Sequence, residues 1–228
     1  MSKSQIEELF KNAVHVGHRT HKWNPRMKKY IYTDRGGIHI INLEKTLDCM
    51  NKALDFLSSS VAEGKNILFV STKPQSVKLL RDAADGCGMP YVVGKWIPGF
   101  LTNFPTIKSR IKYLANLKDQ KANGEFDKYT KKEVVKFDKE IDRLQVALGG
   151  VQHITKKPDV VFVLDVVRDA IVVKEARKLK IPVVGITDTN SDPTTVDYPI
   201  PANDDALKAL KYLMGKVVEA VKSPKKKA

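Results

Sequence analysis

Short apolar runs alternate with amphipathic helical patterns along most of this 228-residue chain, and that alternation constrains its fold more than any other feature. The runs "NILFVST", "VVFVLD" and "IPVVGITD" are apolar almost throughout, as strands are when both faces of a parallel sheet are covered. "GIHIINL" and "PYVVG" add two β-branched runs bounded by glycine or proline. About five strands with intervening helices predict an α/β fold, a flavodoxin-like three-layer doubly wound parallel sheet.

Residues 106–148 break this rhythm, because they contain no strand pattern. Apolar residues there recur at gaps of three and four, and Thr130 and Glu133 form a capping-box pattern before the second repeat. The two stripes are Ile107, Ile111, Leu114 and Leu117, and then Val134, Phe137, Ile141, Leu144 and Leu148. Two helices of roughly 16–18 residues, each about 25 Å long, predict an antiparallel coiled-coil helical hairpin that protrudes from the sheet domain.

The domain organisation follows from this interruption. Residues 1–105 hold an N-terminal segment and the first half of the α/β domain, residues 106–148 the hairpin insert, and residues 149–222 the second half. The remaining residues, 223–228, form a lysine-rich tail that we expect to be disordered.

The net charge of +14 is concentrated in three places. The first 35 residues carry eight Lys/Arg against three Asp/Glu, and the hairpin insert carries eleven against seven. The last eight residues add four lysines and no acidic residue. A concentrated excess of this kind indicates a polyanionic partner, which from charge alone could be RNA, DNA or an anionic membrane.

Hydropathy and cysteine content argue against a membrane-spanning or secreted protein. No apolar run approaches the ~18 residues that a membrane span needs, and the N-terminus "MSKSQIEELF" lacks the apolar core of a signal peptide. Cys49 and Cys87 form no CxxC pair, which is typical of a protein from a reducing cytosol.

No catalytic motif follows any of the strands. The chain contains no GxxxxGK[ST], GxGxxG or GxSxG pattern. The loop "TDTNSDP" begins with the ligand spacing of a calcium loop, but Pro193 and Pro199 stand where that loop needs glycine and glutamate. We interpret "STK", "TDTNSDP" and "ANDDA" as polar caps, and we expect no cofactor and no enzyme activity.

Three histidines at spacings of three, His15, His18 and His21, raise the possibility of a metal site. Gly17 and the Asn24-Pro25 pair make a continuous helix through them unfavourable, and no nearby carboxylate or cysteine completes a ligand set. We therefore expect no metal here.

The same stretch mixes cations with rings and an amide, which together suit RNA. Basic side chains pair with phosphates, rings stack on bases or sugars, and an amide offers a donor and an acceptor. Trp23 could equally be a core anchor. The candidates are His18, Arg19, Lys22, Trp23, Asn24, Arg26, Lys28 and Lys29.

Several long motifs in this order resemble the ribosomal protein S2 family of bacterial type. They are "GHRTHKWNPRMKKYIYTDRGGIHIINLEKT", "LTNFPTI", the charged helical insert and "PVVGITDTNSDPTTVDYPIPANDDA". The resemblance covers about residues 5–220. It implies the same flavodoxin-like domain with a protruding hairpin.

The resemblance further implies a structural role without catalysis. Its implied partners are small-subunit 16S-type rRNA near the head–body junction, and neighbouring proteins that include the large OB-repeat mRNA-binding ribosomal protein. It implies neither a membrane nor a homo-oligomer, and it points to a cytoplasmic small subunit, with an organellar ribosome left open. Beyond the first stretch it adds weaker RNA-binding candidates at the hairpin base: Lys95, Thr102, Asn103, Lys108 and Arg110.

One departure from the family pattern falls at that base. The family usually has Trp-x-Gly-Gly before "LTN", and this chain has Pro98 in the first glycine position. Because proline fixes φ where glycine leaves it free, we expect the local turn to differ. The main alternative function is an α/β enzyme or nucleotide-binding protein with its site at the strand ends. A membrane-surface protein is a third, and it lacks a basic helix with a bulky apolar face.

Overall fold

The computed structural model describes residues 3–223, and the central feature is a five-stranded parallel sheet. Its strands are β4 (Ile67–Ser71), β5 (Tyr91–Val93), β6 (Val160–Val163), β7 (Val183–Thr187) and β8 (Tyr198–Pro201). Their spatial order is β5-β4-β6-β7-β8, which is the 2-1-3-4-5 order of flavodoxin-like sheets. The predicted fold class is confirmed.

Helices cover both faces of this sheet and make it the middle of three layers. One face packs against α2 (Leu43–Ala62), α3 (Val77–Cys87) and α7 (Leu207–Lys222), with Phe69, Phe162 and Leu213 in the shared core. The other face packs against α6 (Ala170–Lys178) and the base of the hairpin. All residues of β4, β6 and β7 are buried, which explains why these strands read as continuous apolar runs.

The segment "GIHIINL" is not part of this sheet. Its strand β3 (Ile38–Ile41) pairs antiparallel with β1 (Val16–Arg19) and β2 (Ile31–Arg35) in a separate three-stranded sheet. The fifth strand of the main sheet is instead β8, from the "YPIPAN" segment. Together with α1 (Lys3–Lys11) and two 3₁₀ turns, Thr20–Lys22 and Pro25–Tyr30, the small sheet forms what we call the N-terminal subdomain, residues 3–41.

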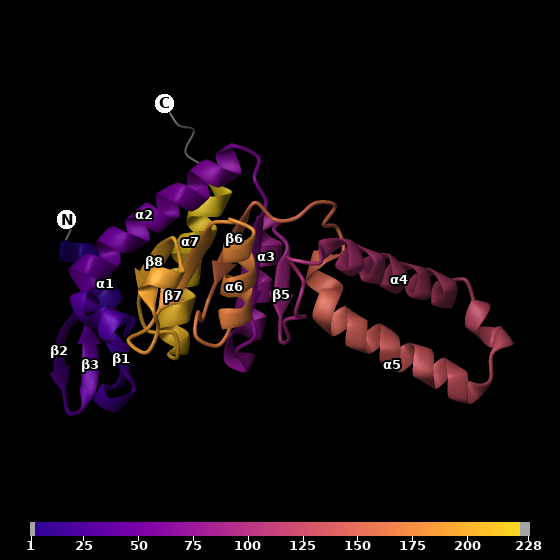
Figure 1. Cartoon of the computed structure of the whole chain (residues 1–228), viewed down its shortest axis with the longest axis horizontal. Helices are drawn as coiled ribbons and strands as arrows, with labels where there is room; N and C mark the ends of the chain where they lie inside the picture. The colour runs from indigo at the N-terminus through magenta and orange to yellow at the C-terminus, as the bar shows by residue number, and fades with distance from the viewer. Residues whose placement is uncertain (1–2, 224–228) are drawn as a thin grey trace.

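The hairpin protrudes from the opposite end of the main sheet (Figure 1). Its helices are α4 (Phe104–Ala122) and α5 (Lys131–Leu148), which lie antiparallel. Most residues of the two predicted stripes are buried, and Leu114 and Leu148 are completely so. The carboxylate of Glu133 accepts bonds from the backbone N–H and the hydroxyl of Thr130, as the capping box predicts.

Two other local predictions need correction. We expected Thr72 to cap a helix, but α3 begins at Val77 after a 3₁₀ turn, Pro74–Ser76. α7 begins at Leu207, and Asn203 instead accepts the backbone N–H groups of Asp205 and Ala206 just before it. Most of the expected disordered tail, residues 224–228, lies outside the described residues. Within the described residues, no helix is long and apolar enough to cross a membrane.

Candidate nucleic-acid interface

The predicted RNA-binding residues fall into two groups at opposite ends of the main sheet (Figure 1). The first group lies in the N-terminal subdomain, beside the β8 edge. The second group lies beside the β5 edge, in what we call the hairpin-base loop, residues 95–103, and in the first turns of α4. The structure therefore does not join them into a single patch.

Exposed cations dominate the first group. Arg19 ends β1, Lys22 ends the first 3₁₀ turn, and Lys28 lies in the second, all with exposed side chains. Among residues 3–223, none of these three side chains makes an ion pair or hydrogen bond. Lys29 is exposed as well, and its ammonium lies 4.7 Å from the centre of the Tyr30 ring. These four side chains are available to an anionic partner.

Arg26 differs from these four because it is already paired. Its guanidinium forms an ion pair with Asp192 and donates to the Thr194 hydroxyl at 3.2 Å. Burial tends to raise the pKa of Asp192, but hydrogen bonds from Thr194, and then the bond and charge of Arg26, hold it below its ordinary value. This pair ties the second 3₁₀ turn to the loop after β7, although 63% of the arginine side chain remains exposed.

Asn24 and Trp23 serve the fold. The Asn24 side chain accepts the backbone N–H of Arg26 at 3.0 Å, and its own backbone N–H donates to the carbonyl of Thr189 at 2.8 Å. The partly buried Trp23 ring packs against His39 with centroids 5.3 Å apart. The alternative of Trp23 as a packing anchor therefore has direct support.

His18 is held by acidic residues rather than presented to solvent. Its Nδ1 lies 3.1 Å from Asp188, and its Nε2 lies 3.5 Å from Asp205. The hydrogen bond to Asp188 is the main cause of the raised pKa of His18. The backbone before His18 lies close to the loop after β7, since a Cβ added at Gly17 would lie 2.5 Å from the Thr189 side chain. The expectation that no carboxylate accompanies the histidines was thus wrong for His18.

His18 adjoins a group of charged residues that the sequence reasoning missed, which we call the carboxyl-edge cluster. Its members follow four different strands: Lys73, Asp165, Asp188, Asp204 and Asp205. All but Asp205 are buried. Each lies in a loop just after a strand, and parallel strands bring such loops to one edge of the sheet. That placement was the available signal, but "STK", "TDTNSDP" and "ANDDA" were interpreted separately as caps, and Asp165 was assigned only to the end of its strand.

The ammonium of Lys73 lies at the centre of this cluster. It contacts Asp204 Oδ1 at 2.9 Å, Asp205 Oδ1 at 2.6 Å and Asp165 Oδ2 at 3.3 Å. Burial alone would lower the pKa of Lys73, but the bonds to Asp205 and Asp204 raise it well above its ordinary value. Burial and the charges of Asp188 and Asp165 raise the pKa of Asp204.

One set of side chains could hold a metal ion. His18, Asp188 and Asp204 each offer a ligand atom, and these atoms lie within 4.8 Å of one another. Imidazole nitrogen with carboxylate oxygen is a donor set that suits zinc. The other two histidines do not join it, since His15 stacks on Phe10 and His21 is exposed on the first 3₁₀ turn. The expected absence of a metal stays a prediction.

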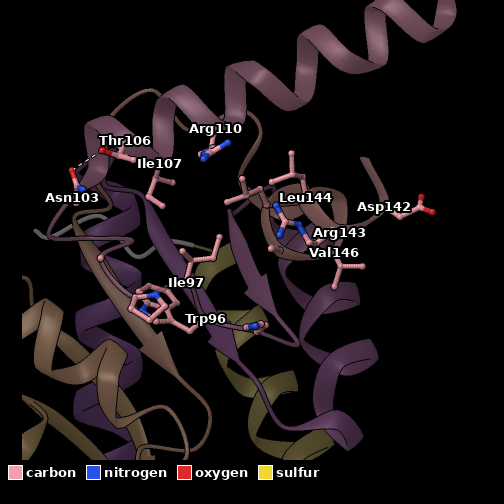
Figure 2. A pocket seen from close by; sticks show the side chains of 15 residues that line it. Trp96, Ile97, Asn103, Thr106, Ile107, Arg110, Asp142, Arg143, Leu144 and Val146 are labelled. Carbon is pink, nitrogen blue, oxygen red and sulfur yellow. Dashed lines mark hydrogen bonds between the residues drawn. The ribbon is translucent and has the colours of Figure 1, made fainter. Parts of the chain in front are cut away.

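The second group surrounds the point where the hairpin leaves the sheet domain. Lys95, Asn103, Lys108 and Arg110 are exposed, and the ammonium of Lys108 donates to the carbonyl of Thr155 at 3.3 Å. Asn103 accepts a bond from the hydroxyl of Thr106 at 2.9 Å (Figure 2). Thr102 is turned inward, because its backbone N–H and hydroxyl both donate to Glu175.

Glu175 of α6 anchors the hairpin-base loop and was not predicted. Its carboxylate accepts bonds from the Trp96 indole and from the backbone N–H groups of Gly99, Leu101 and Thr102. Burial tends to raise the pKa of Glu175, but these bonds hold it below its ordinary value. Gly99 adopts φ of +88°, which glycine accepts readily. Pro98 precedes it in the same turn.

Comparisons with known proteins identify the family of this chain. The model of the family described as Ribosomal protein S2 matches residues 9–223. The chain is 45% identical to the small ribosomal subunit protein uS2 of Dehalococcoides mccartyi strains BAV1 and CBDB1. It is 46% identical to the protein of the same name from strain 195. Each match covers 97% of this chain and 90% of the relative. The chain therefore belongs to the ribosomal protein S2 family and is a structural ribosomal component, not an enzyme.

Proposed function

We propose that this chain is a structural constituent of the cytoplasmic small ribosomal subunit that binds 16S-type rRNA near the head–body junction. The observation that carries the proposal is a group of exposed cations on the N-terminal subdomain. Arg19, Lys22 and Lys28 have no side-chain partner among residues 3–223, and Lys29 is exposed as well. They sit on short, tightly bonded elements of a rigid scaffold. Phosphate contacts from such groups position a protein on folded RNA without reading its sequence.

The hairpin base supplies a second, weaker set of contacts. Lys95, Asn103, Lys108 and Arg110 are exposed there, at the other end of the main sheet. Two separated basic regions on one rigid domain can engage two RNA elements at once and so fix the orientation of the protein. We assign no RNA contact to Thr102, Asn24 or His18, because their side chains serve hydrogen bonds within the fold.

The proposal also includes help in docking the large OB-repeat mRNA-binding ribosomal protein. This part of the proposal rests on the resemblance of the chain to its family. The N-terminal subdomain also exposes an aromatic side chain, Tyr32, with 74% of its surface accessible.

Sedimentation of tagged chain in a cell extract of its source tests the central claim. On a sucrose gradient, we expect the chain to migrate with the small ribosomal subunit and to be released by high salt. Migration only as a free protein, at low salt and with intact subunits present, would contradict the proposal. The same gradient, probed for the OB-repeat protein after depletion of this chain, tests the docking role.

A further inference from the structure

A pocket of about 730 Å³ opens between the hairpin-base loop, the start of α4 and the end of α5 (Figure 2). Its walls are largely apolar, and Figure 2 shows Ile97 and Ile107 extending toward one another from the loop and from α4. The large apolar lining residues are Trp96, Ile97, Ile107, Leu144, Val146 and Leu148. This volume lies in the range of about 300–1,000 Å³ that preformed binding pockets occupy.

The walls of this pocket are fixed by contacts that do not depend on a ligand. The Trp96 indole donates to Glu175 at 3.1 Å, and its ring packs against Phe100 with centroids 4.8 Å apart. Ile107 and Leu148 are buried in the core that joins the hairpin to the sheet. The pocket therefore exists before any partner arrives, and a partner does not have to order it.

The rim of the pocket is basic. Lys95, Arg110 and Arg143 line it with a single acidic residue, Asp142, which Figure 2 shows directed away from both arginines. In the described part of the chain, the side chains of Lys95 and Arg110 have neither an ion pair nor a hydrogen bond. An anionic partner would thus find unpaired cations around an apolar floor.

The chemistry of the walls selects among anionic partners. An RNA base buried here would leave polar edges without hydrogen-bond partners, which costs free energy. A second copy of this chain is unsuitable, since each copy carries a net charge of +14. An apolar side chain needs no polar partner, and its burial against apolar walls is favourable. We propose that this pocket docks an acidic protein segment, which inserts bulky apolar side chains between α4 and α5.

Methyl NMR of the full chain with a synthetic peptide tests this docking site. The probe is acetyl-DEDFLDED-amide, which combines two bulky apolar residues with acidic flanks. We expect saturable shifts confined to the methyl groups of Ile97, Ile107 and Leu148. Replacing the apolar pair, in acetyl-DEDASDED-amide, or the flanks, in acetyl-KRKFLKRK-amide, should abolish them.

A matched pair of variants separates docking from folding. Val146→Glu places a carboxylate at the rim of the pocket, where 65% of the valine is exposed, and should weaken peptide binding at least tenfold. Val135→Glu makes the same change on the same helix, at a residue 51% exposed and outside the lining, and should bind like the wild type. Neither residue lies in the N-terminal subdomain, so rRNA binding through Arg19, Lys22 and Lys28 should be unchanged in both.

Three results would contradict docking of an acidic segment in this pocket. The proposal is overturned if the acidic peptide gives no saturable shift, or if Val146→Glu and Val135→Glu bind it equally. It is also overturned if a 12-nucleotide oligouridylate or octanoate shifts these methyl groups and the peptide does not, because the occupant would then be a nucleic acid or a small amphiphile. None of these outcomes bears on binding of rRNA through the N-terminal subdomain.

Discussion

The indole N–H of Trp96 donates to the carboxylate of Glu175 at 3.1 Å, across 79 residues of sequence. The same carboxylate accepts three backbone N–H groups and one hydroxyl from the hairpin-base loop. One buried side chain of α6 therefore determines where the chain leaves the sheet domain to form the hairpin. It also fixes a wall of the pocket and the position of Lys95 at its rim.

Replacing Glu175 by alanine should lower stability more than an ordinary surface change. The buried indole and the backbone donors would lose their acceptor, at a cost of about 2–4 kcal/mol. For a chain of this size that is a fall in Tm of roughly 5–15 °C by calorimetry. The exposed Glu219→Ala, which removes only a surface pair with Lys216, should change Tm little. Equal Tm values for the two variants would show that Glu175 is not an anchor.

Lys73→Met should be strongly destabilising. The change leaves buried Asp165 and Asp204 without their cation, and breaking such a pair on one side costs about 3–5 kcal/mol. Adding Asp204→Asn to this variant should recover part of the loss, because one buried charge is then removed. Urea denaturation of the two variants measures the difference. A double variant no more stable than Lys73→Met would contradict this account of the cluster.

The pairing of His18 with Asp188 should make stability depend on pH. The folded pKa of His18 is raised above its ordinary value of 6.5, so the charged form is favoured in the folded state. Its contribution is fully present below about pH 6.5 and is lost as the pH rises through the folded pKa. We expect the Tm of the wild type to fall as the pH rises above about 6.5.

The same experiment on His18→Gln isolates the histidine. The pKa of Asp204 is also raised, to about 7, and its contribution falls in the same direction as the pH rises toward that value, so some slope should remain in the variant below about pH 7. The other acidic side chains that contact the His18 imidazole are those of Asp188 and Asp205. A variant with the same pH slope as the wild type would show that His18 does not carry the dependence.

Binding to a small-subunit rRNA fragment should weaken steeply with salt. With about six phosphate contacts, a plot of log K against log salt should have a slope of about −4 to −5. Filter binding or fluorescence anisotropy over several salt concentrations gives the slope directly. A flat dependence would contradict a mechanism based on phosphate contacts.

Charge reversal of Arg19, Lys22 and Lys28 together should weaken rRNA binding at least about tenfold, or ~1.4 kcal/mol. Tm should hardly change, because the three side chains have no bonded partner in the described structure. Arg26 is left out because its pair with Asp192 contributes to the fold.

A second triple variant matches the change in net charge. It reverses three exposed lysines on α6 and α7, Lys174, Lys208 and Lys211, which lie outside both proposed RNA-binding groups. Equal loss of binding in the two triples would indicate nonspecific attraction. A loss of Tm in the first triple alone would mark its cations as structural.

Local patterns in the sequence predicted the elements whose causes are local. The stripes with Ile111 and Leu144, and the capping box at Thr130, predicted the hairpin because helix periodicity and caps depend on neighbours three or four residues away. The buried strands β4, β6 and β7 were equally clear, since both their faces are covered.

What the sequence could not reveal depends on contacts between distant segments. The run at Ile38–Ile41 is a strand, as its residues predicted. It belongs to the separate sheet because it pairs with β1 and β2, and its own residues do not reveal that pairing. Glu175 lies on an ordinary helical pattern, and nothing near it indicates that it binds a loop 73–79 residues earlier. The partner of His18, Asp188, follows a strand 170 residues later, so nothing near the histidine in the sequence indicated this pair.

The hairpin joins β5 to β6 on either side of β4, and the backbone re-enters the domain where Gly150 lies against Tyr91 of β5. The chain thus leaves and re-enters the sheet domain at the same place, and the distal part of the hairpin extends away from that domain (Figure 1). Such an arm can be lengthened or shortened by paired whole turns with the sheet left intact. The length of the hairpin can consequently vary, in nature or by design, without a change in the sheet domain.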